Sequence, residues 1–232
     1  MDLILENTNF AHLLKSSAEH HQHVCPRQVI GVRMGLYAGQ ILGPEVPQTN
    51  KRLFTFIETD GCTLDGVVAG TGCAVGRRTM YIYDYGKIAA TFVDQETGKA
   101  IRIVPNPLAR SLCPEYAPEV MDHWHAYVYA YQIMPLEKLF IIQPVQLTVS
   151  MQAIISLKGA RAVCDACGEE IFNSREVILN GKVLCRSCAG QGYYVTLPPQ
   201  HSTALPEDFS ANPQLVREED EDQAAEGKTY PV

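Results

Sequence analysis

The stretch HHQHVCPRQVIGVRMG (residues 20–35) places three histidines and a cysteine directly before a pattern that is typical of a helix. Pro26 suits the first turn of a helix, because its missing N–H would have no partner there in any case. Apolar residues continue to Leu42, and Gly43-Pro44 then ends the pattern. The sequence therefore predicts a helix over 26–42 with ligand chemistry gathered at its start.

The segments around this helix alternate between helical and extended patterns. Helical periodicity predicts further helices over 8–23, 62–70 and 115–133, with another turn or two over 135–141. Aromatic and β-branched runs predict strands over 53–59, 79–86, 88–95 and 99–105, with the middle two joined at Gly86-Lys87. Because these elements show no βαβ regularity, we expect an α+β fold with an antiparallel sheet.

Charge and composition divide the 232 residues into three parts. Residues 198–232 carry −6 of the net charge of −7, which leaves the rest of the chain near −1. We predict an α+β core domain (1–158), a cysteine-rich module (159–197) and a disordered acidic tail (198–232). A nearly neutral body argues against a nucleic-acid partner, because it offers no basic surface to phosphates.

The first ten residues carry acids where a signal peptide carries bases, and no apolar run is long enough to span a membrane. We therefore expect a cytoplasmic protein without a membrane partner. In that reducing compartment, eight cysteines indicate metal or redox chemistry more readily than structural disulfides.

Four of the cysteines form two C-x-x-C pairs, Cys164/Cys167 and Cys185/Cys188, which seventeen residues separate. Two such pairs complete a closed tetrahedral shell around a structural zinc ion. Asn180-Gly181 between them predicts a hairpin turn, so the module resembles a treble-clef or ribbon zinc finger. The alternatives are a thioredoxin-like dithiol or two accidental pairs. Equal numbers of bases and acids in residues 161–197 favour a structural or protein-contacting finger over a DNA-binding one.

Three candidate ligands, His21, His23 and Cys25, precede the first helix at alternate positions. An extended chain directs alternate side chains to one side, so the three can face a common site. Imidazole nitrogen and thiolate sulfur are good ligands for zinc and also for nickel. We predict a possible second metal ion here. The alternative is that these are hydrogen-bonded core histidines and a small buried cysteine.

Two more cysteines lie beside glycines. GCTLDGV (61–67) has the form of a helix start, where the helix dipole would lower the pKa of Cys62. Asp65 lies one turn further, where it can orient a histidine or act as a base. Glycines on both sides of Cys73 permit close approach of a ligand. We predict Cys62 and Asp65 as catalytic candidates, and Cys62 and Cys73 as further metal ligands in a core cleft.

Taken in order, these motifs resemble the FmdE family, whose name comes from formylmethanofuran dehydrogenase. The resemblance rests on HQHVCPRQVIGVRMG (21–35), on Gly61-Cys62-x-x-Asp65 and Thr71-Gly72-Cys73, and on the four-cysteine finger that some members carry. It implies an α+β core that pairs as an intertwined homodimer, with a cleft lined by the histidines, cysteines and aspartate named above. Arg27 and Gly76-Arg77-Arg78 replace smaller family residues, and such cations can select an anionic ligand such as a carboxylate.

The resemblance favours a zinc-containing, metal-binding accessory protein for a molybdenum or tungsten enzyme, or for its cofactor supply. The chain lacks the cysteine runs of iron–sulfur proteins beyond the sites already assigned, so it is not expected to be the redox catalyst itself. One alternative is a stand-alone enzyme that uses a metal or a cysteine on a small carbonyl or one-carbon compound. A zinc-finger regulator is the third hypothesis, and whether the chain is an enzyme stays open.

Overall fold

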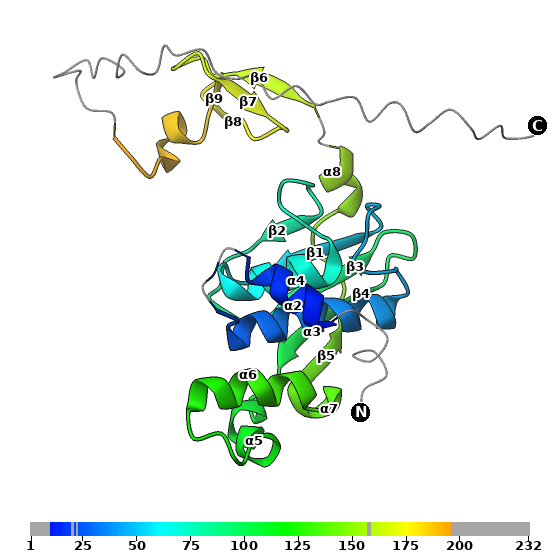
Figure 1. Ribbon diagram of the computed structural model, residues 1–232. Helices are drawn as coiled ribbons and strands as arrows, with labels where there is room; N and C mark the ends of the chain where they lie inside the picture. Colours follow the sequence, from blue (N-terminus) through cyan, green and yellow to red (C-terminus); the bar gives the residue numbers. More distant parts are fainter. Residues whose placement is uncertain (1–9, 20, 22, 157–158, 196–232) are drawn as a thin grey trace, which may run out of the picture. The chain divides into compact units, whose positions relative to one another are not determined.

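The computed structural model describes residues 10–19, 21, 23–156 and 159–195, and the predicted acidic tail (198–232) lies outside them. The chain divides into two compact units, Met1–Ser156 and Leu157–Val232, each described by itself below (Figure 1). No helix in the described part is long and apolar enough to cross a membrane.

The first unit is a five-stranded sheet with helices. Its strands are β1 (Leu53–Ile57), β2 (Met80–Ile82), β3 (Ala90–Asp94), β4 (Ala100–Pro105) and β5 (Phe140–Pro144). Its helices are α2 (Phe10–Ser17), α3 (Pro26–Leu42), α4 (Cys62–Thr71), α5 (Ala109–Tyr116), α6 (His123–Ile133), α7 (Leu136–Leu139) and α8 (Met151–Ser156). The strand order is β2-β1-β3-β4-β5. The predicted mixture of helices and a largely antiparallel sheet is confirmed.

One pair of strands departs from the prediction. β2 pairs in parallel with β1, with Phe56 opposite Tyr81, while β3 pairs antiparallel on the other side of β1. The hairpin predicted around Gly86-Lys87 therefore does not form. Helix α4 is the reason, because it carries the chain from the end of β1 back to the start of β2, as a crossover between parallel strands requires.

The predicted helix over 115–133 is also divided. α5 ends at Tyr116 and α6 begins at His123, with Pro118 between them. Proline disfavours helical geometry at the residue before it, which explains a stop at Ala117. Asp122 then caps α6 by accepting a hydrogen bond from the His125 backbone N–H at 3.0 Å.

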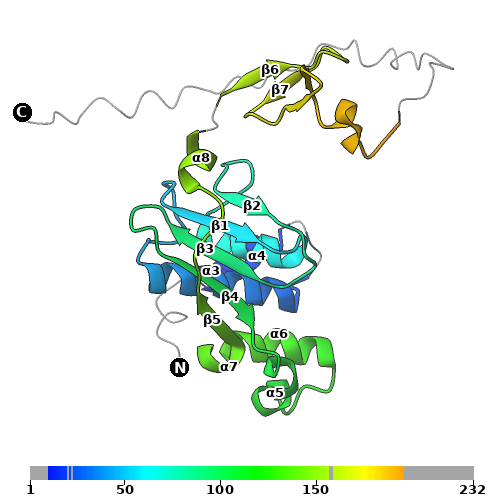
Figure 2. The same ribbon diagram turned by 180° about the vertical axis from the view of Figure 1, so that it is seen from behind.

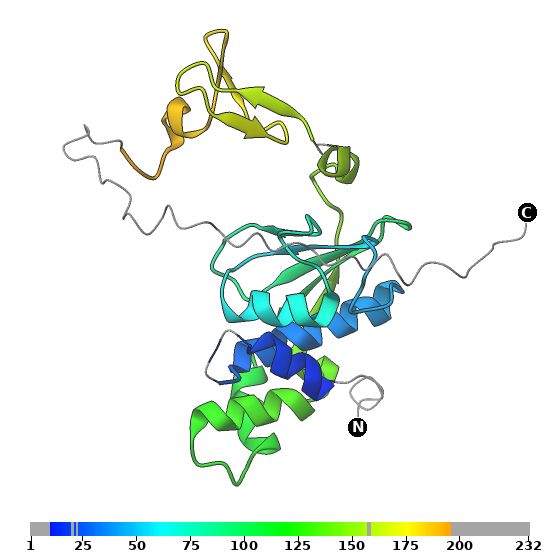
Figure 3. The same cartoon turned by 45° about the horizontal axis from the view of Figure 1, so that its top comes forward.

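Helices α3 and α4 lie together against one face of the sheet (Figures 2 and 3). β1 is buried along its whole length because both of its faces are covered. Leu53 and Ile57 join the main core with the helices, whereas Phe54 and Phe56 join a smaller cluster that includes side chains of α8. The alternation of side chains along a strand produces this division between the two faces.

An ion pair ties β3 to the segment before β1. The Asp94 carboxylate is fully buried and accepts hydrogen bonds from Nε and Nη2 of Arg52 at 2.8 and 2.9 Å. The Arg52 guanidinium holds the pKa of Asp94 down to about 2, and a hydrogen bond from Thr97 also lowers it. The charged form of Asp94 therefore stabilises the folded core.

Asp94→Asn is expected to lower the free energy of unfolding by about 1–3 kcal/mol at neutral pH, because it leaves the Arg52 side without its carboxylate. The contribution of Asp94 is complete above its ordinary pKa of 3.8 and is lost as the pH falls toward 2. Urea unfolding of the core between pH 7 and pH 2 measures both effects. The exposed neighbour Glu96, also near Arg52, provides the control Glu96→Gln. Equal acid sensitivity of Asp94→Asn and the parent chain would contradict the assignment.

The second unit consists of two short hairpins and a turn. β6 (Arg161–Val163) pairs with β7 (Glu170–Phe172), β8 (Val177–Leu179) pairs with β9 (Lys182–Leu184), and the turn η1 (Ser187–Gln191) follows. Asn180 and Gly181 both have positive φ, at 52° and 76°, so the predicted hairpin turn is confirmed. Among the described residues of this unit, Cys164, Ile171 and Leu184 form the buried apolar cluster. A core of this size needs a further source of stability.

Candidate functional site

The four cysteines of the second unit converge. Their sulfur atoms all lie within 4.8 Å of one another, and those of Cys167 and Cys185 are 4.0 Å apart. A tetrahedral zinc ion with bonds of about 2.3 Å holds its sulfur ligands roughly 3.8 Å apart. Two knuckles supply them, one after β6 and one after β9. The donor set and its spacing therefore fit the predicted structural zinc site.

Hydrogen bonds prepare this sulfur cluster for a cation. The backbone N–H of Cys185 donates to Cys164 Sγ at 3.3 Å and is the main cause that lowers the pKa of Cys164 to about 6. Hydrogen bonding among the crowded thiols instead raises the pKa of Cys188 to about 12. A bound zinc ion removes this conflict, because it deprotonates the thiols that coordinate it.

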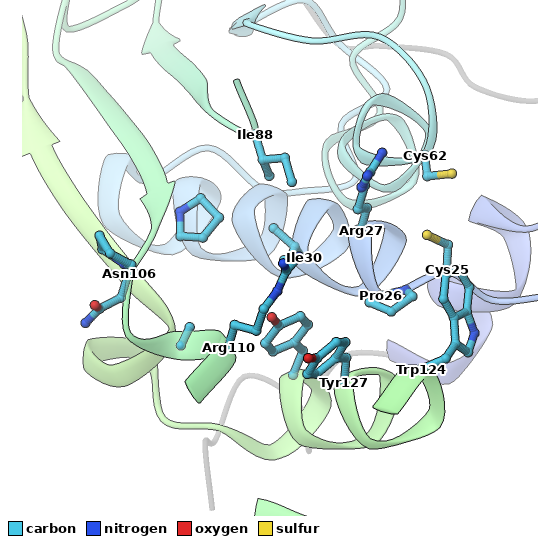
Figure 4. Close-up of a pocket in the computed structure, with 14 residues that line it drawn as sticks. Cys25, Pro26, Arg27, Ile30, Cys62, Ile88, Asn106, Arg110, Trp124 and Tyr127 are labelled. Carbon is cyan, nitrogen blue, oxygen red and sulfur yellow. The ribbon is translucent and has the colours of Figure 1, made fainter. Parts of the chain in front are cut away.

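The first unit contains a cavity of about 640 Å³. Its walls come from the start of α3, the first residue of α4, the end of β4, and helices α5 and α6 (Figure 4). Cys25 and Cys62 lie at one end, Arg27 and Arg110 supply its two cations, and Trp124, Tyr127 and Tyr131 supply its aromatic surface. The volume lies within the range of small-molecule sites in proteins.

Helix α3 positions Cys25 through a buried glutamine. Gln28 Oε1 accepts a hydrogen bond from the Cys25 backbone N–H at 2.6 Å. The Gln28 side-chain amide in turn donates to the carbonyl of Ser17, at the end of α2, at 2.7 Å. Gln28 is fully buried, so these two bonds satisfy an amide that water cannot reach. Cys25 is thereby fixed at the cavity by two helices.

The sulfur atom of Cys62 lies beside that of Cys25 (Figure 4). Burial raises the pKa of the Cys62 thiol, and hydrogen bonding to Cys25 and the charge of Asp65 raise it further. The helix start does lower it through a backbone hydrogen bond, as the sequence led us to expect, but burial outweighs that effect. Cys62 is therefore a neutral thiol at pH 7, which disfavours it as a nucleophile.

Asp65 and the two predicted histidines form separate contacts. His21 Nε2 lies 2.9 Å from Asp65 Oδ2, so the carboxylate orients this imidazole. The His23 ring packs edge-on against Trp124, with ring centroids 5.3 Å apart. Neither histidine lines the cavity that Cys25 and Cys62 share. Among the described residues, the four finger cysteines are the one group of three or more such ligands close enough to hold a metal ion.

Cys73 requires a correction, because the structure places it in the hydrophobic core and not in the cleft. It is fully buried, donates from its sulfur to the Leu53 carbonyl at 3.3 Å, and accepts from the Gln48 side-chain amide at 3.2 Å. Burial raises the pKa of its thiol. Gly72 ends α4 with a φ of 69° and so turns the chain inward toward Gln48. The glycine beside Cys73 therefore serves a helix end.

Sequence reasoning missed the contribution of Arg110 and of the aromatic surface to this cavity. Arg110 Cζ lies 5.5 Å from the centroid of the Tyr127 ring, and this ring stacks on Tyr131 at 6.0 Å with an interplanar angle of 13°. The spacing of four residues between the tyrosines was the available signal, since it places both on one helix face. Their approach to Cys25 depends on the packing of α6 against α3.

Comparison with known proteins assigns both units. Residues 20–141, just over half of the 232 residues, match the family described as "FmdE, Molybdenum formylmethanofuran dehydrogenase operon". Residues 159–193 match the prokaryotic dksA/traR C4-type zinc finger. The chain belongs to the FmdE family and carries a four-cysteine zinc finger after the family domain.

Two relatives extend this assignment. A protein of Archaeoglobus fulgidus named "Probable S-adenosyl-L-methionine-binding protein" is 28% identical over 205 residues, which span 79% of this chain and 54% of that protein. The chain thus spans about half the length of this relative. A crystal structure of a tungsten formylmethanofuran dehydrogenase FmdE-like protein from Syntrophus aciditrophicus has a TM-score of 0.54 and 17% identity, and the match covers 82% of this chain and 97% of that one. This second likeness supports the fold.

Proposed function

We propose that the core unit binds S-adenosylmethionine or a closely similar adenosine compound in the cavity between α3, α5 and α6. The observation that carries the proposal is the cavity itself, which combines aromatic faces, two arginines and a volume of about 640 Å³. The name of the Archaeoglobus fulgidus relative supports this choice of ligand.

The chemistry of the ligand matches these walls in three parts. An adenine ring gains from stacking on an aromatic face, which Tyr127 and Trp124 offer. A carboxylate suits an arginine guanidinium, which binds it with two parallel hydrogen bonds. A sulfonium cation is stabilised over aromatic rings. The neutral thiols of Cys25 and Cys62 form an uncharged end of the site.

Isothermal titration calorimetry of the full chain with S-adenosylmethionine is expected to show one site per chain. Tyr127→Ala is expected to weaken binding about tenfold or more, because base–aromatic stacking contributes on the order of 1–3 kcal/mol. Tyr85→Ala is the matched control, since this tyrosine is 63% exposed and lies outside the cavity. The absence of binding to the parent chain, or an equal loss in both variants, would refute the proposal.

A second candidate is a role as an accessory to a molybdenum or tungsten enzyme of the formylmethanofuran dehydrogenase type. The description of the matching family supports it, and the neutral, protein-contacting finger offers a surface for a partner. Co-expression with the components of such an enzyme, followed by size-exclusion chromatography with light scattering, tests this role and homodimer formation together. A chain that elutes alone as a monomer, with and without S-adenosylmethionine, would contradict both.

A further inference from the structure

We infer that the cavity binds an oxyanion, a carboxylate or phosphate group of its ligand, through the guanidinium of Arg110, with Arg27 as a second cation. This inference deepens the proposed function and takes its adenosine probes from it. The anion site itself is argued from the charges and packing of the cavity walls.

The cavity is positively charged in a chain that is negative overall. Arg27 and Arg110 line it, and among the described residues no aspartate or glutamate does. The whole chain carries a net charge of −7. A concave surface with one sign of charge concentrates ligands of the opposite sign. The electrostatics therefore favour an anionic group at this place.

Arg110 differs from the arginines that hold the fold together. Arg52 and Arg102 form ion pairs with Asp94 and Glu58. Arg77 donates to four backbone carbonyls. In the described part of the chain, by contrast, no carboxylate pairs with Arg110. Its charge is therefore available to a ligand.

The aromatic surface holds Arg110 ready for this role. The guanidinium carbon lies 5.5 Å from the centroid of the Tyr127 ring, which Tyr131 supports by stacking. Figure 4 shows the Arg110 side chain beside Tyr127, directed into the cavity from α5. A guanidinium packed by its face on a ring keeps its N–H edge free for the two parallel hydrogen bonds that an oxyanion accepts. The loss of side-chain freedom on binding is correspondingly small.

The test compares four probes on the full chain by the fluorescence of Trp124, the one tryptophan of the chain, which lies in the cavity wall. The probes are S-adenosylmethionine (carboxylate), adenosine 5′-monophosphate (phosphate), adenosine (no anion) and inorganic phosphate (no adenine). We expect at least one anionic nucleoside to bind about tenfold or more tightly than adenosine, as charge-assisted hydrogen bonds imply. The better of the two identifies the source of the anion.

Arg110→Gln is expected to remove this preference while adenosine binds as before, and Arg110→Lys is expected to restore part of it. Arg175→Gln, an exposed arginine of the finger unit, is the matched control and should change nothing. Equal weakening of all probes by Arg110→Gln would overturn the inference in favour of a packing role. So would a failure of all four probes to bind the parent chain. Binding of the monophosphate or phosphate without S-adenosylmethionine would refute the proposed ligand and leave the anion site standing.

Discussion

Cys164→Ser is expected to release the zinc ion and unfold the second unit, while the core unit keeps its fold. The small apolar cluster of Cys164, Ile171 and Leu184 cannot hold two hairpins together alone. Zinc binding by four thiolates supplies about 10–16 kcal/mol of apparent free energy in comparable fingers, so its loss exceeds any other change in this unit. The separate core clusters of the first unit contain none of these residues.

Metal analysis and ¹H–¹⁵N NMR spectra of the full chain measure both parts of this result. We expect one zinc ion per parent chain and none in Cys164→Ser, with collapse of the finger resonances alone. Cys62→Ser is the matched control, because this cysteine lies in the core cavity and should leave the zinc content unchanged. A zinc-free chain with an intact finger would contradict the role of the ion, and loss of metal from Cys62→Ser would indicate a second site.

Gly66→Ala is expected to lower the free energy of unfolding of the core by about 1–3 kcal/mol, as overpacked interiors do. A Cβ atom there would collide with the Gln28 carbonyl oxygen and the backbone of Gly31, across the contact between α4 and α3. The backbone cannot move aside as a flexible side chain would. Alanine otherwise stabilises a helix interior relative to glycine by about 1 kcal/mol, so a net loss reports the collision.

Thermal and urea unfolding of the core measure this change. Gly76→Ala is the control, since a Cβ atom at Gly76 meets nothing within 4 Å. The account predicts a lower midpoint for Gly66→Ala and none of that loss for Gly76→Ala. Unchanged or increased stability of Gly66→Ala would show that α3 and α4 can separate slightly without cost, and the close helix contact would then not position Cys25 and Cys62.

Local signals explain the parts of the fold that the sequence predicted well. Helix α3 has the predicted bounds because Pro26 and Gly43 mark its ends, and Gly43 adopts the left-handed φ of 100° that a helix end favours. The finger was predictable because two knuckles and Asn180-Gly181 each act over a few residues. The parallel pairing of β2 with β1 was missed, since it depends on the path of α4 and not on the strand itself.

The site divides in the same way. The motifs around Cys25 and Cys62 indicated that these cysteines belong together, and the structure brings them to one end of the cavity. Arg110 and Trp124 come from helices more than forty residues further along the chain, and no local pattern links them to Cys25. Cys73 lay in an equally suggestive motif, but its glycine ends a helix. Glycine beside cysteine has two physical explanations that the sequence alone does not separate.

The central claim is that the core cavity holds a small ligand, and the indole N–H resonance of Trp124 tests it most directly. As the one tryptophan of the chain, Trp124 gives a single indole signal in a ¹⁵N-labelled sample. Titration with S-adenosylmethionine should shift this signal to saturation at one equivalent per chain, with a dissociation constant that agrees with calorimetry. A Trp124 signal that stays in place while calorimetry reports binding, or while no binding occurs at all, would contradict the account.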